Sequence, residues 1–236
     1  MTNIYDKKFA ETFSKPSISN ERVNSPALMK VLGNVEGKKV LDLGCGNGYW
    51  LRKLVKKGAV CVGVDSSSEQ LEIAKKLDKD KKISFIKKDI MKPLNFREKY
   101  DVVLLVKVLL EESNKGKVLK IIKNAQDALK TNGRLVILDL HPFAPSFQDT
   151  IEVGKNYNYF DSGVVVRAKS TNIKGDAVYY DDHHWTFSDL SDFLYNKFLI
   201  KKIIEHRSSA ELVKKFPSLN NRLKKPMDII VEAIKI

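Results

Sequence analysis

Short apolar runs alternate with helical patterns along residues 39–139. An apolar run of five to seven residues is typical of a buried strand, and apolar residues that recur every three to four positions are typical of an amphipathic helix. Strands that alternate with helices predict an α/β fold, in which a parallel sheet carries helices on both faces. We expect strands near 39–43, 60–64, 83–87, 101–106 and 133–139, and helices over 48–57, 67–77 and 115–130.

Local signals mark the ends of these and later elements. Ser66 is the expected N-cap of the helix over 67–77, and Asn132-Gly133 the expected end of the helix that starts at 115. A helix over 186–197, with Thr186 or Ser188 near its cap, and strands over 199–206 and 227–236 follow, the last strand being antiparallel. Residues 1–36 mix aromatic, proline and small polar residues, which favours one or two short helices that form an N-terminal cap.

Between residues 141 and 184 the periodicity weakens. Prolines and glycines interrupt this segment. An insertion after the fifth strand of an α/β sheet lies beyond the carboxyl ends of the strands, where ligands bind, so we expect a substrate lid within a single domain of residues 1–236. Aromatic residues cluster in this segment at Tyr157, Tyr159, Phe160, Tyr179 and Tyr180.

The segment from Val40 to Trp50 carries the most specific chemistry. An apolar run ends in Gly44, Gly46 and Gly48, which allow a sharp turn, a close approach of ligand to backbone and free N–H groups at a helix start. Asp65 follows a second apolar run and stands where an acid accepts the hydroxyls of a ribose. The Gly-x-Gly-x-Gly spacing and the acid Asp42 before it argue against a dinucleotide pyrophosphate, and favour a ligand with a positive amino group.

Asp42 to Gly48 resembles motif I of the class I S-adenosylmethionine-dependent methyltransferases, whose hallmark is (E/D)-x-G-x-G-x-G. Residues 62–67, 88–90, 100–105 and 128–137 resemble later parts of the same family. The resemblance implies a Rossmann-like, seven-stranded, mostly parallel sheet and S-adenosyl-L-methionine as methyl donor, with S-adenosyl-L-homocysteine as product. The donor-binding residues it implies are Tyr5, Asp42, Gly44, Cys45, Gly46, Asp65, Ser66, Asp89, Ile90 and Val106.

Each of these assignments has a simpler alternative. Asp42 and Asp89 could serve ordinary turn or cap chemistry. Tyr5 and Phe13 could close over the donor or pack onto the sheet. For the general base the candidates are His184 and His141, with His183 beside them, because histidine is most readily poised near neutral pH. Residues 184–189 resemble a stretch that small-molecule methyltransferases carry beside the acceptor, although Trp185 stands in place of an arginine, and Leu110 stands where many members carry a histidine.

Composition limits the location and the bound groups. The chain has 236 residues, of which 43% are hydrophobic and 30% charged, as expected for a globular protein. It has no signal-like N-terminus and no long apolar run, so we expect a cytoplasmic protein without membrane attachment. Cys45 and Cys61 predict neither a disulfide framework nor a zinc site, and methyl transfer requires no metal.

The net charge of +13 raises the question of a nucleic-acid acceptor. The lysines are spread over many predicted helices without a dense stripe interleaved with aromatics. Two features of nucleobase methyltransferases are also missing: an Asn/Asp-Pro-Pro-aromatic motif after the fourth strand and a cysteine placed as nucleophile. We therefore expect methyl transfer to oxygen or nitrogen of a small molecule. The alternatives are an RNA methyltransferase, a nicotinamide-dependent oxidoreductase and a non-catalytic donor-binding module. We expect the protein to be a monomer or a homodimer.

Overall fold

Seven strands form one sheet in the computed structural model, which describes residues 16–147, 151–153, 156–171 and 177–236. Their order is β3-β2-β1-β4-β5-β10-β9, and β10 is antiparallel to both of its neighbours whereas the pairs from β3 to β5 are parallel. The Rossmann-like sheet with an antiparallel last strand is thus confirmed. The strands are β1 (Lys39–Leu43), β2 (Val60–Asp65), β3 (Ile83–Lys87), β4 (Tyr100–Val106), β5 (Leu129–Leu140), β9 (Phe198–Ile204) and β10 (Asp228–Lys235).

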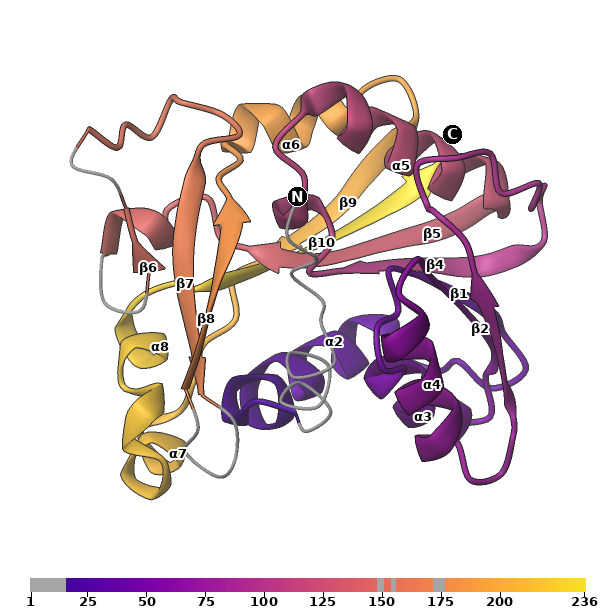
Figure 1. Ribbon diagram of the computed structural model, residues 1–236, viewed down its shortest axis with the longest axis horizontal. Coiled ribbons are helices and arrows are strands. Elements are labelled where there is room, and N and C mark those ends of the chain that lie inside the picture. Colours follow the sequence, from indigo (N-terminus) through magenta and orange to yellow (C-terminus); the bar gives the residue numbers. More distant parts are fainter. Residues whose placement is uncertain (1–15, 148–150, 154–155, 172–176) are drawn as a thin grey trace.

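Helices cover both faces of this sheet (Figure 1). Alternate residues of the central strand β4 point to opposite faces, so Val103 and Leu105 pack in the core with α5 and α6, and Val102 and Leu104 in the core with α2 and α3. The helices are α2 (Ser25–Leu32), α3 (Tyr49–Val55), α4 (Ser68–Leu77), α5 (Lys115–Ala128) and α6 (Phe187–Leu194), with shorter turns η1 (Asn20–Asn24), η2 (Leu109–Glu111), η3 (Ala144–Phe147), α7 (Ala210–Lys215), η4 (Pro217–Leu219) and α8 (Asn221–Lys224).

Two of the expected element ends are wrong, and one is confirmed. The N-cap of α4 is Ser67, whose Oγ accepts from the Gln70 N–H at 3.1 Å, and not Ser66. Helix α5 ends at Ala128, because Asn132, with φ of 59°, and its neighbour Gly133 lie inside β5 at a shift in its register with β4. The left-handed residue therefore serves a bulge instead of a helix stop. Thr186 caps α6 in a reciprocal capping box, as expected.

The insertion after β5 forms a second sheet that periodicity did not predict. Its three antiparallel strands, in the order β6-β7-β8, are β6 (Ile151–Glu152), β7 (Val165–Thr171) and β8 (Ala177–His183). Val166 and Ala168 of β7 are buried whereas Val165 is exposed, which is the alternation of a sheet with one covered face. Figure 1 shows β7 and β8 crossing the ends of the main strands, with α7 and α8 beside them.

Trp185 fixes the end of this insertion to the main sheet. Its indole Nε1 donates to the carbonyl oxygen of Leu109 in η2 at 2.8 Å, and its ring packs edge-on against Phe193. One residue earlier, the backbone of His184 exchanges hydrogen bonds with Gly163 and Val164 at 2.7 and 2.9 Å. The loop after β4 and the second sheet are therefore held as one unit. Within the described ranges, no helix has the length and apolar character needed to span a lipid bilayer.

Trp185→Phe is expected to lower the free energy of unfolding by about 1 kcal/mol, because the buried Leu109 carbonyl loses the shorter of its two hydrogen bonds and keeps only the one from the Glu112 N–H. Chemical denaturation measures this change. Trp50→Phe makes the same change of volume at another buried tryptophan and is the control. An equal loss in the two variants would show that the indole hydrogen bond contributes nothing of its own.

Candidate functional site

The loop that follows β1 is tied to the end of β2. The N–H groups of Gly44 and Cys45 both donate to the carbonyl oxygen of Val64, at 2.8 and 3.0 Å. The Gly46 N–H donates to Oδ2 of Asp65 at 2.7 Å. The loop therefore stands at the carboxyl edge of the sheet, where ligands bind in this topology.

Sterics require glycine in this loop. Gly44 and Gly48 have φ of +77° and +72°, a region that residues with a Cβ rarely adopt. A Cβ on Gly44 would lie 2.8 Å from Cγ2 of Val108, and one on Gly48 would lie 2.9 Å from Cζ of Phe85. The turn can pass between β3 and the loop after β4 only because these positions lack side chains.

Asp65 combines a structural role with the expected binding role. Its Oδ1 accepts from the Ser67 N–H at 2.9 Å, while Oδ2 accepts from Gly46. Burial raises the pKa of Asp65, and the N–H groups of Ser67 and Gly46 oppose that rise. Each carboxylate oxygen has a further lone pair, so Asp65 retains the capacity to accept ligand hydroxyls.

Asp42 is a buried acid without a hydrogen-bond partner. Its side chain is 1% exposed, and neither carboxylate oxygen receives a hydrogen bond in the described part of the chain. Burial, with a smaller contribution from the charge of Asp65, raises the pKa of Asp42 to about 8. Turn or cap chemistry, the simpler explanation, does not account for a carboxylate that caps nothing.

A cavity of about 650 Å³ runs from the glycine loop to the second sheet. This volume lies within the range of roughly 300–1,000 Å³ that small-molecule sites occupy. Asp42 lies outside its lining, and Tyr5 and Phe13 fall outside the described residues. The residues of the expected donor site that line the cavity are Gly44, Cys45, Gly46, Asp65, Ser66, Asp89, Ile90 and Val106.

The Asp89-Ile90 turn is held from two sides. Oδ1 of Asp89 accepts from the Met91 N–H at 2.8 Å, which is the ordinary turn chemistry considered above. Nδ2 of Asn124, on α5, donates to the carbonyl oxygen of Ile90 at 2.8 Å. The turn is rigid and faces the cavity, so its structural role is compatible with adenine recognition.

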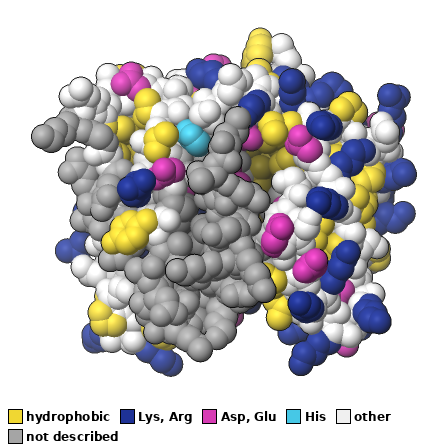
Figure 2. Space-filling model, viewed as in Figure 1, with side chains coloured by type: hydrophobic (Ala, Val, Ile, Leu, Met, Phe, Trp, Pro, Cys, Tyr) yellow, Lys and Arg dark blue, Asp and Glu magenta, His cyan; other side chains and the backbone are white. Residues whose placement is uncertain are grey.

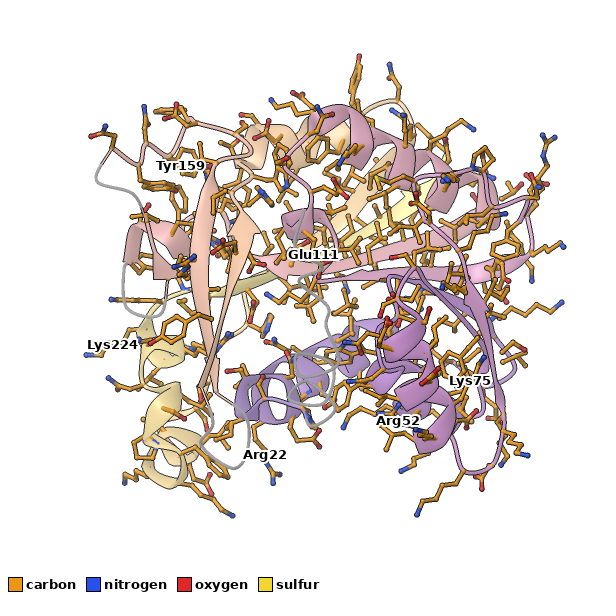
Figure 3. All side chains as sticks on the ribbon, in the orientation of Figure 1. Arg22, Arg52, Lys75, Glu111, Tyr159 and Lys224 are labelled. Carbon is orange, nitrogen blue, oxygen red and sulfur yellow. The ribbon has the colours of Figure 1, made fainter. Side chains whose placement is uncertain are left out.

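The N-terminal helices are fastened to the other side of the loop. Tyr49, the first residue of α3, donates through its hydroxyl to Glu21, which also pairs with Lys53 at 3.1 Å. Arg52, labelled in Figure 3, donates to the carbonyl oxygen of Asn47. Residues 16–20 then line the cavity beside the loop.

At its far end the cavity has an ion-paired cluster. Asp228, at the start of β10, is 1% exposed and pairs with Lys107 and Arg222. Burial would raise the pKa of Asp228, but the charges of Arg222 and Lys107 outweigh it and hold the pKa well below the ordinary range. The cluster connects the end of β4, α8 and β10, and the positive charges of Lys107 and Arg222 balance the negative charge of Asp228.

Neither His184 nor His141 lines the 650 Å³ cavity. His184 is 1% exposed, and its Nε2 donates to the carbonyl oxygen of Tyr159, a residue labelled in Figure 3, at 2.7 Å. His141 is equally buried, and its Nε2 lies 2.7 Å from Glu205. Burial lowers the pKa of both imidazoles. Their placement favours a structural role, in which His184 fastens the insertion.

His183 is the histidine that the structure brings to the large cavity. Its Nδ1 lies 3.0 Å from the carbonyl oxygen of Leu110. A carbonyl oxygen can only accept, so Nδ1 carries the proton and Nε2 holds the free lone pair in the neutral ring. His183 is therefore oriented by η2 and has a basic nitrogen free.

The sequence did not single out Asp182, Arg222 and Asp228, which also line the cavity. They come from β8, α8 and β10, whose positions depend on pairing between distant segments. A signal was present in residues 181–183, where three consecutive polar residues end a strand. Sequence alone could not show that Asp182, 3% exposed, faces inward.

Comparison with known proteins identifies the class. A family model described as a methyltransferase domain matches residues 34–189. The crystal structure of a proposed S-adenosylmethionine-dependent methyltransferase from Listeria monocytogenes aligns with a TM-score of 0.70 and 25% identity, over 90% of this chain and 96% of that one. Among curated relatives, a demethylmenaquinone methyltransferase of Lactococcus lactis is 28% identical over 65% of this chain and 67% of its own length.

A ubiquinone biosynthesis O-methyltransferase of a Shewanella species is 31% identical, over 53% of this chain and 52% of its own length. The chain thus spans about half to two thirds of these two curated relatives. The chain belongs to the class I S-adenosylmethionine-dependent methyltransferases. Its loop fits the cofactor of that class, because Gly44, Cys45, Gly46 and Asp65 together line a cavity large enough for a small molecule.

Asp42→Asn is expected to raise stability while weakening donor binding. Because the folded pKa lies above the unfolded value of 3.8, the native state holds an extra proton between the two pKa values, and Asp42 destabilises the fold increasingly as pH rises from about 4 to 8. Removing an unpartnered buried carboxylate is worth about 1 kcal/mol, or a Tm rise of about 2–4 °C.

Thermal unfolding should show a larger gain at pH 8 than at pH 5, and calorimetry should show weaker binding of S-adenosylhomocysteine. Asp101→Asn is the control. Asp101 lies in β4, next to β1, and its ion pair with Lys130 is lost in the variant, so Tm should fall. A gain for Asp42→Asn that is independent of pH would contradict the assigned ionisation.

Proposed function

We propose that the enzyme methylates an oxygen or nitrogen of a small molecule that occupies the cavity between η2, β8 and β10. The observation that carries this proposal is the continuity of the cavity, which extends from the glycine loop to the second sheet. Residues of β6, β7 and β8 line that end, and the insertion to which these strands belong acts as the substrate lid. The names of the curated relatives, which concern quinone biosynthesis, support a small-molecule acceptor.

The donor end of the cavity orients the cofactor. Bound S-adenosylmethionine supplies a methyl group activated by a sulfonium, and S-adenosylhomocysteine is the product. Asp65 would hold the ribose hydroxyls, the N–H groups of the loop would face the amino-acid portion, and the Asp89-Ile90 turn would bind the adenine. These groups would fix the donor. The remaining task of the protein is to position the acceptor and to remove its proton.

His183 is the general base in this proposal. Its Nε2 is the unprotonated ring nitrogen, and η2 and β8 hold the ring at the acceptor end of the cavity. A proton taken by Nε2 leaves Nδ1 bonded to the Leu110 carbonyl, so the ring need not turn during the transfer. This role replaces the one expected for His184.

The charges of the cavity do not favour RNA. Figure 2 shows Lys and Arg side chains spread along the right-hand side of the visible face, with acidic and polar residues among them. In the described part of the lining, the charged residues are Lys107 and Arg222 against the acids Asp65, Asp89, Glu111, Glu112, Asp181, Asp182 and Asp228. Both of these cations pair with Asp228, so the described lining offers a phosphate no uncommitted cation, although the net charge of the chain is +13.

The proposal is tested by where the methyl group goes. The protein is incubated with methyl-labelled S-adenosylmethionine and a cell extract that contains both metabolites and RNA. Label is expected in the acid-soluble, small-molecule fraction. Label confined to acid-precipitated RNA would overturn the small-molecule acceptor, and labelling that falls steeply with added salt would point the same way.

His183→Ala is expected to lower kcat in this assay by about 10²–10⁴-fold, because a positioned base contributes about that much. S-adenosylhomocysteine should bind it as it binds wild type. His184→Ala removes the same ring one residue away and is the control. It is expected to lower the free energy of unfolding, and to change kcat much less than His183→Ala does. Full turnover by His183→Ala would exclude it as the base.

A further inference from the structure

The acidic lining of the acceptor end is mostly neutralised by neighbouring cations. Asp228 pairs with Lys107 and Arg222, as described above. Glu112 lies 3.2 Å from Lys117, and Asp181 lies 2.9 Å from Arg167. These acids have protein partners, so none of them requires a charge from the ligand.

Asp182 is different. Its side chain is 3% exposed and lines the cavity, but no described side chain or backbone group donates a hydrogen bond to it or forms an ion pair with it. Burial raises its pKa well above the ordinary value, and the nearby acids Asp139 and Glu111 add to this rise, against the opposing charge of Lys107. A carboxylate in such a place is costly unless a donor reaches it from the cavity.

The surroundings of Asp182 are apolar. Val166, its partner across the β7–β8 pair, is fully buried. Figure 3 shows Glu111 at the centre of the molecule, where η2 approaches β8. The walls of this end of the cavity are Leu110, Leu140, Ile151, Val165, Ala168 and Met227. One unpaired carboxylate among aliphatic walls suits a ligand that has a cationic head group and an otherwise apolar structure.

We infer that the acceptor is a small amine with an apolar body, whose ammonium group is bound by Asp182 and whose nitrogen receives the methyl group. This inference rests on the proposed function and narrows its oxygen-or-nitrogen choice to nitrogen. His183, the next residue, lines the same cavity and supplies the base.

The step balances as follows. The ammonium loses one proton to Nε2 of His183, which frees the nitrogen lone pair. That pair forms the new C–N bond as the C–S bond breaks, and the electrons of the C–S bond return to sulfur as a neutral thioether. The product is an N-methylammonium, which retains a charge for Asp182.

The test compares probes that differ only in their head group. With S-adenosylhomocysteine saturating, calorimetry measures the binding of 2-phenylethylamine against 2-phenylethanol and 3-phenylpropanoate, and of hexylamine against hexanol and heptanoate. Each amine is expected to bind at least about tenfold more tightly than its alcohol, because a charge-assisted hydrogen bond to a buried carboxylate is worth that much or more. The carboxylates should bind most weakly.

Asp182→Asn should abolish the preference for amines and leave the affinity for the alcohols unchanged. Its Tm should equal or exceed that of wild type, because a neutral amide replaces an unpartnered carboxylate. Asp192→Asn, the same change on the exposed face of α6, is the control and should retain the preference.

The inference is overturned if neither amine binds more tightly than its alcohol, or if none of the probes binds. It is also overturned if Asp182→Asn keeps the preference for amines. In those cases binding of S-adenosylhomocysteine, and label in the small-molecule fraction, would leave the proposed function standing. Loss of S-adenosylhomocysteine binding by the wild type would instead mean that the proposed function itself is wrong.

Discussion

The Asp65 carboxylate joins the end of β2 to the glycine loop after β1, with 2.7 Å between Oδ2 and the Gly46 nitrogen. Because Oδ1 also accepts from Ser67, one side chain orders both the loop and the start of α4. The glycines permit the turn, and Asp65 selects one conformation of it. The donor end of the cavity is therefore already shaped before any ligand arrives, which lowers the entropic cost of binding.

Several acids are buried in a protein whose net charge is +13. Asp42, Asp139 and Asp182 are buried carboxylates whose pKa burial raises, to about 8 for Asp42 and about 6 for Asp139. Asp139 accepts from N–H groups of η2 and β5. Asp42, in β1 and outside the cavity lining, and Asp182, in that lining, receive no hydrogen bond from a described group. In the proposals above, these two buried carboxylates cost stability and serve to bind cationic groups.

The residues proposed to bind the donor could be found in the sequence because their signals are local. The glycine loop, Asp65 and the Asp89 turn follow strands whose apolar runs set their depth and direction. The acceptor half depends on long-range pairing: β8 meets β7 and η2, and α8 brings Arg222 to β10. Asp182 also breaks the apolar alternation of β8, because a buried acid occupies a core position. Periodicity therefore could not predict this strand, and it could not show whether His183 or His184 faces the cavity.

Calorimetric titration of wild type and Asp65→Ala with S-adenosylhomocysteine, with NAD in parallel, tests the central role of Asp65 most directly. We expect micromolar binding of S-adenosylhomocysteine to wild type, no binding of NAD, and a loss of affinity of at least about 100-fold in Asp65→Ala, since both the hydroxyl acceptor and the Gly46 anchor are removed. Equal affinity in the two proteins, or a preference for NAD, would contradict this account of the site.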